Sequence, residues 1–565
     1  MKKELVMAAL GDVEIDLVLK NGYVLNMFTE EIIKTDVAIK GDTIVGMGKY
    51  SGKLEIDCTG KYISPGFIDA HMHIESSMVS PIEFSKIVMK KGTTTVISDP
   101  HEIVNVLGRK GLEYMISATE NVPINVFIMI PSSVPAADID TNGAGEFSAM
   151  EMLEYKSHPR ILGLAEVMRV SDVINLEKNM FEKINLFDDM VIDGHAPGLS
   201  GKKLQAYRMA GIYNDHESEN GREAIEKLRA GFYLMIREGS GARNLEPIIN
   251  SLLQNNIAID RCMFCTDDKH LQDIEIEGHI NYCVRKAIEF GLPIMKAYKM
   301  ATYQPAQAYN LKNLGAIGAG YKADILIFDD IKSVKPVKVF CSGIDIDVLE
   351  AQFDYHQNLN EEITNTIKFD NINFSDIALK KNEKNYVIEL VPNSLLTKLK
   401  YEPIPGNINF SPDKTYSKLC VVERYGKTNT IAVCPLRGYE IFQGAIACSI
   451  SHDSHNIVVV GDNDNDIILA TNELKRIQGG IVIVSKGQVV ELLQLEIAGL
   501  MTDRPYNIVR KQLNKMLKVA KGLNISDGVD PFITLVFLSL TAIPEVRLIE
   551  KGLYDVVSET IIPES

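Results

Sequence analysis

The sequence predicts an α/β protein built on a (β/α)8 TIM-type barrel, with a small composite β domain and a C-terminal α+β domain. Residues 63–270 alternate short apolar runs with longer amphipathic stretches, the pattern of parallel strands joined by helices. We count eight such runs, the number that closes a barrel of this type. Further short apolar runs flank this region on both sides, which predicts additional sheets.

The region before the barrel is expected to be a small β unit. Residues 16–22 and 36–46 hold short apolar runs with Asn-Gly and Gly-Asp dipeptides, which are typical of strands joined by tight turns. A similar run follows the barrel at residues 318–330. We therefore assign residues 1–62 and 312–350 to the two parts of one composite β domain and expect them to pair.

The barrel itself is assigned to residues 63–311, with helical segments from residue 278 onward completing it. Its strands are predicted at residues 66–73, 93–99, 124–130, 161–167, 190–195, 211–216, 232–237 and 260–267. Residues 351–385 are polar and are assigned as a linker. Residues 386–565 mix apolar strands with helices and are assigned as a separate α+β domain.

The composition is that of a soluble globular protein. Of its 565 residues, 46% are hydrophobic and 24% charged, which is enough apolar material for large cores. The formal net charge is -16, from 59 basic and 75 acidic residues, and the basic residues are dispersed. This charge argues against nucleic acid and anionic membranes as partners. We expect a small-molecule substrate and a homo-oligomer, a dimer or larger.

The start of the chain does not have the pattern of an export signal. Glu4 interrupts the first apolar stretch, so this stretch fails as a signal peptide. The longest apolar run, at residues 531–544, is too short to cross a bilayer. Eight cysteines lie mostly inside apolar segments, as small buried side chains do in a reducing compartment. We therefore expect a cytoplasmic protein.

Two histidines at the end of the first barrel strand predict half of a metal site. His71 and His73 are two residues apart, so a regular strand points both side chains to the same face. The apolar residues around them mark the strand as buried. Two buried imidazoles in one place need partners, and a metal ion is one such partner.

Most other predicted strands also end in side chains that bind metals. The strand ends carry Asp99, His101 and Glu102 (second strand), Glu166 (fourth), His195 (fifth), His216 (sixth), and Asp267 and Asp268 (eighth). The carboxyl ends of barrel strands meet at one face, where such folds build their active sites. Packing alone does not call for so many histidines and carboxylates, so a metal site is favoured over a solvated rim of unrelated polar groups.

These segments resemble a known family. The strand at residues 65–73, Pro-Gly-Phe-Ile-Asp-Ala-His-Met-His, and the split β unit resemble the amidohydrolase superfamily. The segments at residues 99–102, 163–167, 193–198, 214–217 and 265–268 resemble those of bacterial adenine deaminases. Two distal segments, at residues 451–456 and 539–547, resemble the C-terminal domain of the same family, so the resemblance covers nearly the whole chain.

The resemblance implies two divalent metal ions. One would be held by His71, His73 and Asp267, and Glu166 would bridge to a second one held by His195 and His216. Imidazoles and carboxylates without thiolates suit Mn²⁺, Fe²⁺ or Zn²⁺. From the resemblance we favour manganese.

The implied reaction converts adenine to hypoxanthine and ammonia, a step of purine salvage in nucleotide metabolism. Metal-activated hydroxide attacks C6, and a carboxylate takes the water proton and returns it to the leaving nitrogen. Asp267 is our candidate for this proton transfer. Asp268 points to the opposite face of a regular strand, but at a strand end the two roles could be exchanged. A helix cap or loop acceptor competes evenly for Asp268.

The residues that end the second strand have less certain tasks. His101 and Glu102 could bind the purine edge or support metal ligands, and a plain role at the start of the next helix competes evenly for Glu102. Asp99 could orient His101 or a ligand from the first strand. We therefore expect all three near the substrate or the metal ligands.

Three further motifs are not needed for this chemistry. Residues 262 and 265 form an isolated Cys-x-x-Cys pair inside a predicted strand, where core packing is favoured. Residues 462–473 have calcium-loop spacing, but Ile467 occupies the position that needs glycine. His452, Asp453 and His455 could bind metal, reach the barrel mouth, or form a buried hydrogen-bond network, and the network is favoured.

Two other functions on the same scaffold are weighed against deamination. A cyclic amide hydrolase of the dihydroorotase or hydantoinase type often uses a carbamylated lysine at the end of the fourth strand, where this chain has Ala165, Glu166 and Val167. A non-catalytic assembly protein is expected to have lost metal ligands, and this chain retains them. Adenine deamination is therefore the predicted function.

Overall fold

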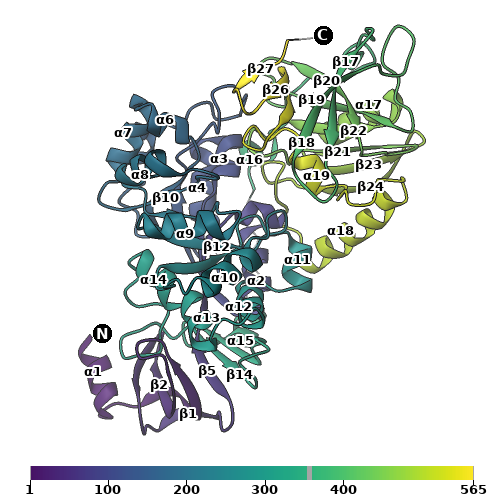
Figure 1. Ribbon diagram of the computed structural model, residues 1–565. Coiled ribbons are helices and arrows are strands. Elements are labelled where there is room, and N and C mark those ends of the chain that lie inside the picture. The colour runs from purple at the N-terminus through teal and green to yellow at the C-terminus, as the bar shows by residue number, and fades with distance from the viewer. Residues whose placement is uncertain (1, 353–358, 564–565) are drawn as a thin grey trace.

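The computed structural model describes residues 2–352 and 359–563. In Figure 1 the chain runs from an N-terminal sheet at the bottom, through a barrel in the middle, to a C-terminal sheet at the top. The fold class predicted from the sequence is confirmed. None of the helices in the described residues is both long and apolar enough to span a membrane.

The barrel consists of eight parallel strands in sequence order. They are β6 (Phe67–Met72), β7 (Thr93–Ser98), β8 (Asn125–Ile130), β9 (Ile161–Val167), β10 (Val191–Gly194), β11 (Asn214–Asp215), β12 (Tyr233–Arg237) and β13 (Cys262–Cys265). The last and first strands meet where the Asp267 amide donates to the His71 carbonyl at 3.0 Å. All eight predicted strands are present, each shorter than or equal to its predicted range.

Helices surround these strands and bury their apolar sides against them. They are α2 (Pro81–Lys90), α3 (His101–Leu107), α4 (Arg109–Ala118), α5 (Ala149–Leu153), α6 (Val170–Ile174), α7 (Lys178–Leu186), α8 (Gly201–Met209), α9 (Gly221–Arg229), α10 (Leu245–Gln254), α11 (Leu271–Ile276), α12 (Ile280–Glu289), α13 (Ile294–Met300) and α14 (Tyr303–Ala308). Helix α9 begins at Gly221 because the preceding Asn220 caps it: the Asn220 side chain accepts hydrogen bonds from the Arg222 and Glu223 amides at 3.1 and 3.2 Å.

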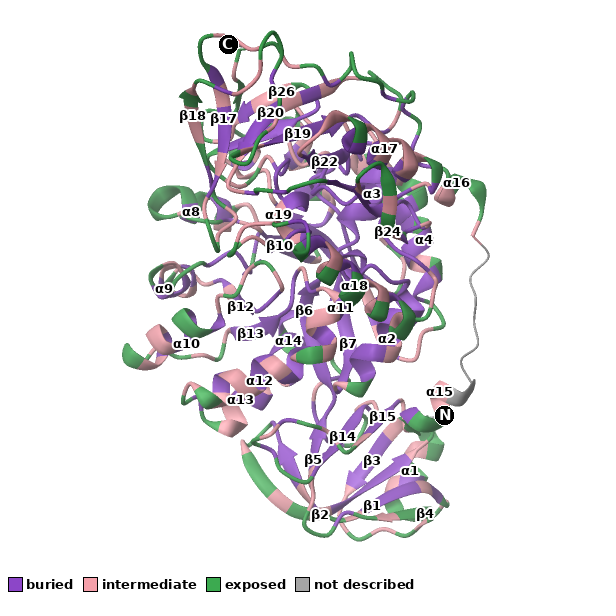
Figure 2. Ribbon diagram, turned by 90° about the vertical axis from the view of Figure 1, so that its right-hand side faces the viewer, coloured by how far each residue is buried: buried purple, intermediate pink, exposed green. Residues whose placement is uncertain are grey.

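The barrel interior away from the strand ends is filled by apolar side chains. Ile68, Ala70, Met235 and Met263 belong to one buried cluster there, closed by Tyr309 and other residues that follow α14. Figure 2 shows β6, β7, β12 and β13 as mostly buried. The barrel is therefore a packed core, and polar chemistry is confined to its carboxyl-terminal mouth.

A register irregularity between Asp69 and Met72 sets the direction of the two histidines on β6. Ile68 and Ala70 point into the apolar interior, whereas His71 and His73, with the opposite parity, point into the mouth. A bulge in a strand re-aims the side chains that follow it. Simple alternation placed the two histidines on one face but did not reveal this change of phase.

The N-terminal sheet joins segments from both sides of the barrel. Its strands are β1 (Ile15–Asn26), β2 (Glu31–Lys40), β3 (Thr43–Met47), β4 (Gly52–Asp57), β5 (Tyr62–Pro65), β14 (Ile325–Phe328), β15 (Lys338–Cys341) and β16 (Ile344–Asp345), with helices α1 (Lys2–Leu10) and α15 (Ile346–Gln352) beside them. Antiparallel pairing of β5 with β14 connects the two segments. The expected pairing of the two segments that flank the barrel in the sequence is thus observed.

The C-terminal part contains an eight-stranded sheet and a small three-stranded sheet. Its strands are β17 (Asn385–Leu390), β18 (Thr397–Glu402), β19 (Tyr416–Val422), β20 (Ile431–Arg437), β21 (Ala445–Cys448), β22 (Ile457–Gly461), β23 (Gly480–Ser485), β24 (Gln488–Gln494), β25 (Val546–Ile549), β26 (Gly552–Asp555) and β27 (Thr560–Ile561). Its helices are α16 (Glu361–Thr364), α17 (Asp464–Arg476), α18 (Tyr506–Lys521) and α19 (Ile533–Val536).

The segment assigned as a linker, residues 351–385, is only partly described, because residues 353–358 lie outside the described residues. Within it, Ile367, Phe369, Ile372 and Ile377 are buried against the large C-terminal sheet and α17. These four side chains therefore belong to the core of the C-terminal part. The exact domain boundaries remain a prediction.

Candidate metal centre

The predicted metal ligands from five different strands lie together at the barrel mouth. His73 Nε2 is 3.0 Å from Asp267 Oδ1 and 3.5 Å from Glu166 Oε1. His71 Nε2 is 3.7 Å from each of the same two oxygen atoms. These four residues enclose one space from three strand ends.

The other oxygen of Glu166 faces the second pair of histidines. His195 Nδ1 is 2.5 Å and His216 Nε2 is 3.2 Å from Glu166 Oε2. The two oxygens of one carboxylate therefore point to two separate imidazole pairs. A carboxylate placed in this way could contact cations on both sides.

Several buried ring nitrogens at this place have no hydrogen-bond partner among the described residues. They are Nε2 of His71, Nδ1 of His101 and both ring nitrogens of His216. The His216 nitrogen that lies 3.2 Å from Glu166 is not aligned for a hydrogen bond. Burying an imidazole nitrogen without a partner is costly, so these atoms fit a site that binds cations. The donors are nitrogen and oxygen only, which suits Mn²⁺, Fe²⁺ or Zn²⁺.

The charges at the mouth keep the carboxylates ionised. Burial alone would raise the pKa of Glu166, but the charges of His195 and His216 hold it well below its usual range. Burial also opposes ionisation of Asp267, whose pKa is held well below its usual range by the neighbouring imidazoles of His71 and His73 and by the charge of Arg237. Ionised carboxylates are what cation binding needs.

Neighbouring groups fix the orientation of the ligands. His73 Nδ1 donates to the Asp99 carbonyl oxygen at 2.8 Å. With the ring proton on Nδ1, the lone pair of Nε2 is available to a metal ion. Asp215 accepts from the amides of Ala196 and Glu217 at 2.9 and 3.0 Å, and the buried ammonium of Lys227 pairs with it at 2.5 Å. These contacts hold the chain on both sides of His216.

The residues of the second strand end lie at the same mouth. His101 Nδ1 is 3.4 Å from both Glu166 Oε1 and Asp99 Oδ2. Asp99 therefore contacts His101, one of the two partners that the sequence analysis considered for it. Glu102 has a different environment: its two oxygens contact His452 Nδ1 and His455 Nε2 from the C-terminal part. The loop at residues 451–456 therefore reaches the barrel mouth.

Asp267 and Asp268 occupy different environments. Asp267 has a left-handed backbone with φ of 55°, so the strand has already ended and regular alternation no longer applies. Its carboxylate faces the histidines, whereas Asp268 accepts a hydrogen bond from the Ser76 hydroxyl. The geometry thus places Asp267 nearer the predicted metal ligands, and the division of their roles remains a prediction.

The sequence reasoning missed Arg237, and it assigned no role to Glu217, which lies in the strand-end segment at residues 214–217. Arg237, at the end of β12, donates to Asp267 Oδ2 at 2.9 Å and to Glu217 Oε2 at 3.0 Å. Glu217 Oε1 is 3.5 Å from His216 Nε2. The position of Arg237 at a strand end is its signal in the sequence, but a guanidinium has no acceptor atom for a cation, so a pattern of metal ligands does not include it.

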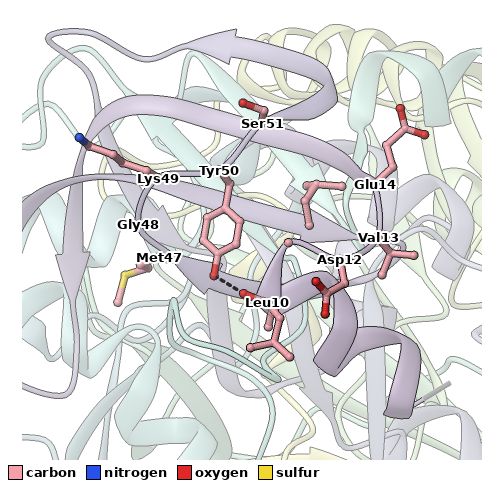
Figure 3. A pocket seen from close by; sticks show the side chains of 12 residues that line it. Leu10, Asp12, Val13, Glu14, Met47, Gly48, Lys49, Tyr50 and Ser51 are labelled. Atoms are coloured by element: carbon pink, nitrogen blue, oxygen red, sulfur yellow. Dashed lines mark hydrogen bonds between the residues drawn. The ribbon is translucent and has the colours of Figure 1, made fainter.

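A cavity away from the barrel mouth lies at the N-terminal sheet. It has a volume of about 580 Å³ and is lined by residues 9–15 and 47–51. Figure 3 shows it between α1 and the loop after β3, where the Tyr50 hydroxyl donates to the Ala9 carbonyl. It contains none of the predicted site residues, so its size does not mark the site.

Two family models match the chain. The model of the amidohydrolase family matches residues 62–344, and that of the adenine deaminase C-terminal domain matches residues 394–560. The first match contains every predicted metal ligand. The adenine deaminase of Desulfitobacterium hafniense (strain Y51) is 43% identical to this chain over 562 residues, covering 99% of this chain and 98% of the relative. The chain belongs to the adenine deaminase family of amidohydrolases.

Other members of the adenine deaminase family match over the same length. Adenine deaminase 2 of Carboxydothermus hydrogenoformans is 42% identical over 568 residues, covering 100% of this chain and 99% of the relative. The adenine deaminase of Clostridium acetobutylicum is 41% identical over 571 residues, covering 98% and 99%. The family resemblance predicted from the sequence is confirmed, and the amidohydrolase fold agrees with the clusters of metal-binding side chains at the barrel mouth.

Proposed function

We propose that this chain is an adenine deaminase that hydrolyses adenine to hypoxanthine and ammonia, using two divalent metal ions at the barrel mouth. The observation that carries this proposal is the position of Glu166, whose two oxygens face two separate histidine pairs. Relatives named adenine deaminase, at 41–43% identity over nearly the whole chain, support the choice of substrate.

His71, His73 and Asp267 would hold one ion and His195 with His216 the other, with Glu166 between them. Cations bound by these residues would lower the pKa of a bound water enough to supply hydroxide near neutral pH. The nitrogen and oxygen donors suit manganese, iron(II) and zinc alike, and manganese is favoured from the family resemblance.

Asp267 is proposed to move the proton in this reaction. Its low pKa keeps it ionised, so it can accept the proton of the attacking water. The same proton is then passed to the exocyclic nitrogen at C6, which leaves as ammonia. Arg237 and His73 each contact one oxygen of Asp267 and so fix its orientation during both transfers. Asp268, held by Ser76, is the alternative for this role.

The substrate is proposed to be the free purine base, as in purine salvage, and the protein to act in the cytoplasm as a homo-oligomer. Neutral adenine offers no charge, so recognition rests on ring shape and hydrogen bonds. Asp99, His101 and Glu102 are proposed to lie near the substrate or to support the ligands. The alternative, a cyclic amide hydrolase, is not favoured, because no lysine stands beside Glu166 on β9.

Two assays of the purified full chain test the proposal: ammonia release from adenine, adenosine and cytosine, and ring opening of dihydroorotate followed by chromatography of the product. We expect release from adenine alone. Glu166→Gln keeps the size of the side chain but removes the bridging charge, so it should lose metal and nearly all activity. Asp267→Asn should lower kcat by about 10²–10⁴-fold, the usual cost of losing a general base.

The matched control is Asp268→Asn, which should retain much more activity than Asp267→Asn. The reverse order would exchange the two roles while leaving the substrate unchanged. Release of ammonia from cytosine, or hydrolysis of dihydroorotate without action on adenine, would refute the proposed substrate.

A further inference from the structure

The junction between the barrel and the C-terminal part contains a second cluster of metal-binding side chains. Glu102 on α3 contacts His452 Nδ1 with one oxygen and His455 Nε2 with the other. All three side chains are buried, with exposed fractions of 2%, 4% and 1%. This cluster joins residues that are 350 positions apart in the sequence.

A small cavity lies within this cluster. Its volume is about 10 Å³, and it is lined by Glu75, Ser76, Glu102, Ile450, His452, His455 and Leu500. A space of this size holds about one water molecule or one ion, and it is far too small for a purine. Two glutamates and two histidines are therefore among the residues around it.

Glu75 provides independent support for a cation. Its Oε1 accepts from the Ile103 amide at 3.2 Å, but its Oε2 is buried and has no hydrogen-bond partner. A buried carboxylate oxygen without a partner is costly, and a second carboxylate, that of Glu102, lines the same cavity. A cation in the cavity would satisfy the open oxygen and offset the repulsion between the two carboxylates.

We propose that Glu75, Glu102, His452 and His455 bind one divalent metal ion at this junction, separate from the centre at the barrel mouth. Two imidazole nitrogens and two carboxylates form a donor set suited to Zn²⁺, Mn²⁺ or Fe²⁺, and their charges balance the ion. The proposal does not depend on which reaction the barrel catalyses.

The two imidazoles are held in place by their surroundings. The His452 ring stacks on Phe537, with ring centroids 4.9 Å apart and planes at 19°. His455 Nδ1 is 3.5 Å from the Ser451 amide, at the outer limit of a hydrogen bond, so this contact does not fix the ring proton. His455 Nε2 can therefore bind either a metal or the Glu102 carboxylate directly.

An ion at this place would link the C-terminal part to the active site. The loop that carries both histidines also carries Asp453, whose Oδ1 is 3.5 Å from His101 Nε2. His101 in turn lies 3.4 Å from Glu166. Binding at the junction would thus hold the loop against the mouth without contacting the substrate.

The competing interpretation is a metal-free ion pair between Glu102 and the two histidines. Glu75 separates the two interpretations, because neither of its oxygens contacts His452 or His455 through a hydrogen bond in the described structure. Glu75→Gln should remove a metal ligand in the first case and should leave the ion pair intact in the second.

The experiment counts metal ions in the full-length protein. Apoprotein prepared with a chelator is reloaded with Mn²⁺ or, separately, Zn²⁺, freed of excess metal, and analysed by mass spectrometry of the elements. We expect one equivalent less in Glu75→Gln than in the wild type, and the same loss in the double variant His452→Asn, His455→Gln. Glu83→Gln is the matched control, because Glu83 is a buried carboxylate between α2 and the Tyr506 amide with no histidine in contact.

A second measurement keeps the test independent of folding and of the proposed reaction. The variant His195→Asn, His216→Asn disrupts the barrel centre and should still bind the junction ion, as judged by one equivalent that Glu75→Gln removes. Equal metal content in wild type and in a folded Glu75→Gln protein would overturn the proposal. If that variant does not fold, equal content in the His452, His455 double variant overturns it. Activity on adenine in a protein that binds no junction ion would overturn this proposal and support the proposed function.

Discussion

At the scale of single residues, the division of labour between the two oxygens of Glu166 organises the site. One oxygen faces His71 and His73 and the other faces His195 and His216. Because each oxygen of Glu166 lies beside one histidine pair, a single carboxylate links the two pairs. Arg237 then compensates the negative charge of Asp267 from outside the ring of ligands.

Replacing Arg237 tests this compensation. Arg237→Met leaves Glu217 and Asp267 without their shared guanidinium, so Asp267 should rotate or take up a proton. We expect kcat for adenine to fall by about 10–100-fold, as for other residues that orient metal ligands. Arg237→Lys keeps the charge but loses the two-pronged geometry and should recover only part of the activity. Unchanged kcat in Arg237→Met would show that Asp267 is oriented by other groups.

At the scale of elements, the sixth strand is the least regular part of the barrel. Strand β11 has only two residues, yet it must present His216 accurately. The buried pair of Asp215 and Lys227 replaces the missing strand hydrogen bonds by fixing the turn from both sides, since Asp215 also accepts from two backbone amides. A short strand is tolerated because an ion pair and its hydrogen bonds hold the local chain.

Lys227→Met tests the role of this pair. Lys227 and Asp215 are fully buried, so removing the ammonium leaves an uncompensated carboxylate, at a cost of about 3–5 kcal/mol of stability. Burial opposes ionisation of Asp215, but the charge of Lys227 holds its pKa below the ordinary value of 3.8. Thermal and urea unfolding of both proteins measure the difference.

The pH dependence of that difference has a definite sign. A carboxyl with a lowered pKa contributes stability above its ordinary pKa and loses that contribution as the pH falls through the lower value. The wild type should therefore exceed Lys227→Met most clearly at neutral pH, and the gap should shrink as the pH falls below the ordinary pKa of an aspartate. A gap that grows on acidification would contradict this account.

At the scale of the whole molecule, the site depends on both the barrel and the C-terminal part. The N-terminal sheet lies at the other end of the barrel and carries none of the predicted ligands (Figure 1). The C-terminal part contributes His452, Asp453 and His455 directly to the mouth. Loss of metal should therefore loosen contacts between the two parts as well as the barrel centre.

Chelation tests this coupling. Ligand that binds only the folded state stabilises it by about 4 kcal/mol at a thousandfold excess over Kd. We expect the unfolding temperature to fall after treatment with a chelator and to recover on addition of Mn²⁺. The variant His195→Asn, His216→Asn should show a smaller fall. An unfolding temperature that is insensitive to metal would indicate that the folded ligands are held without ions.

The sequence by itself determined the barrel, its strands and the predicted ligands, because strand periodicity and the meeting of carboxyl strand ends follow from short-range geometry. Its motifs also predicted membership of the adenine deaminase family, which the comparisons confirmed. Only the tertiary structure revealed that Arg237 compensates Asp267, that β6 changes phase before His71, and that Glu102 meets His452 and His455. These depend on contacts between segments tens to hundreds of residues apart, which local patterns do not encode.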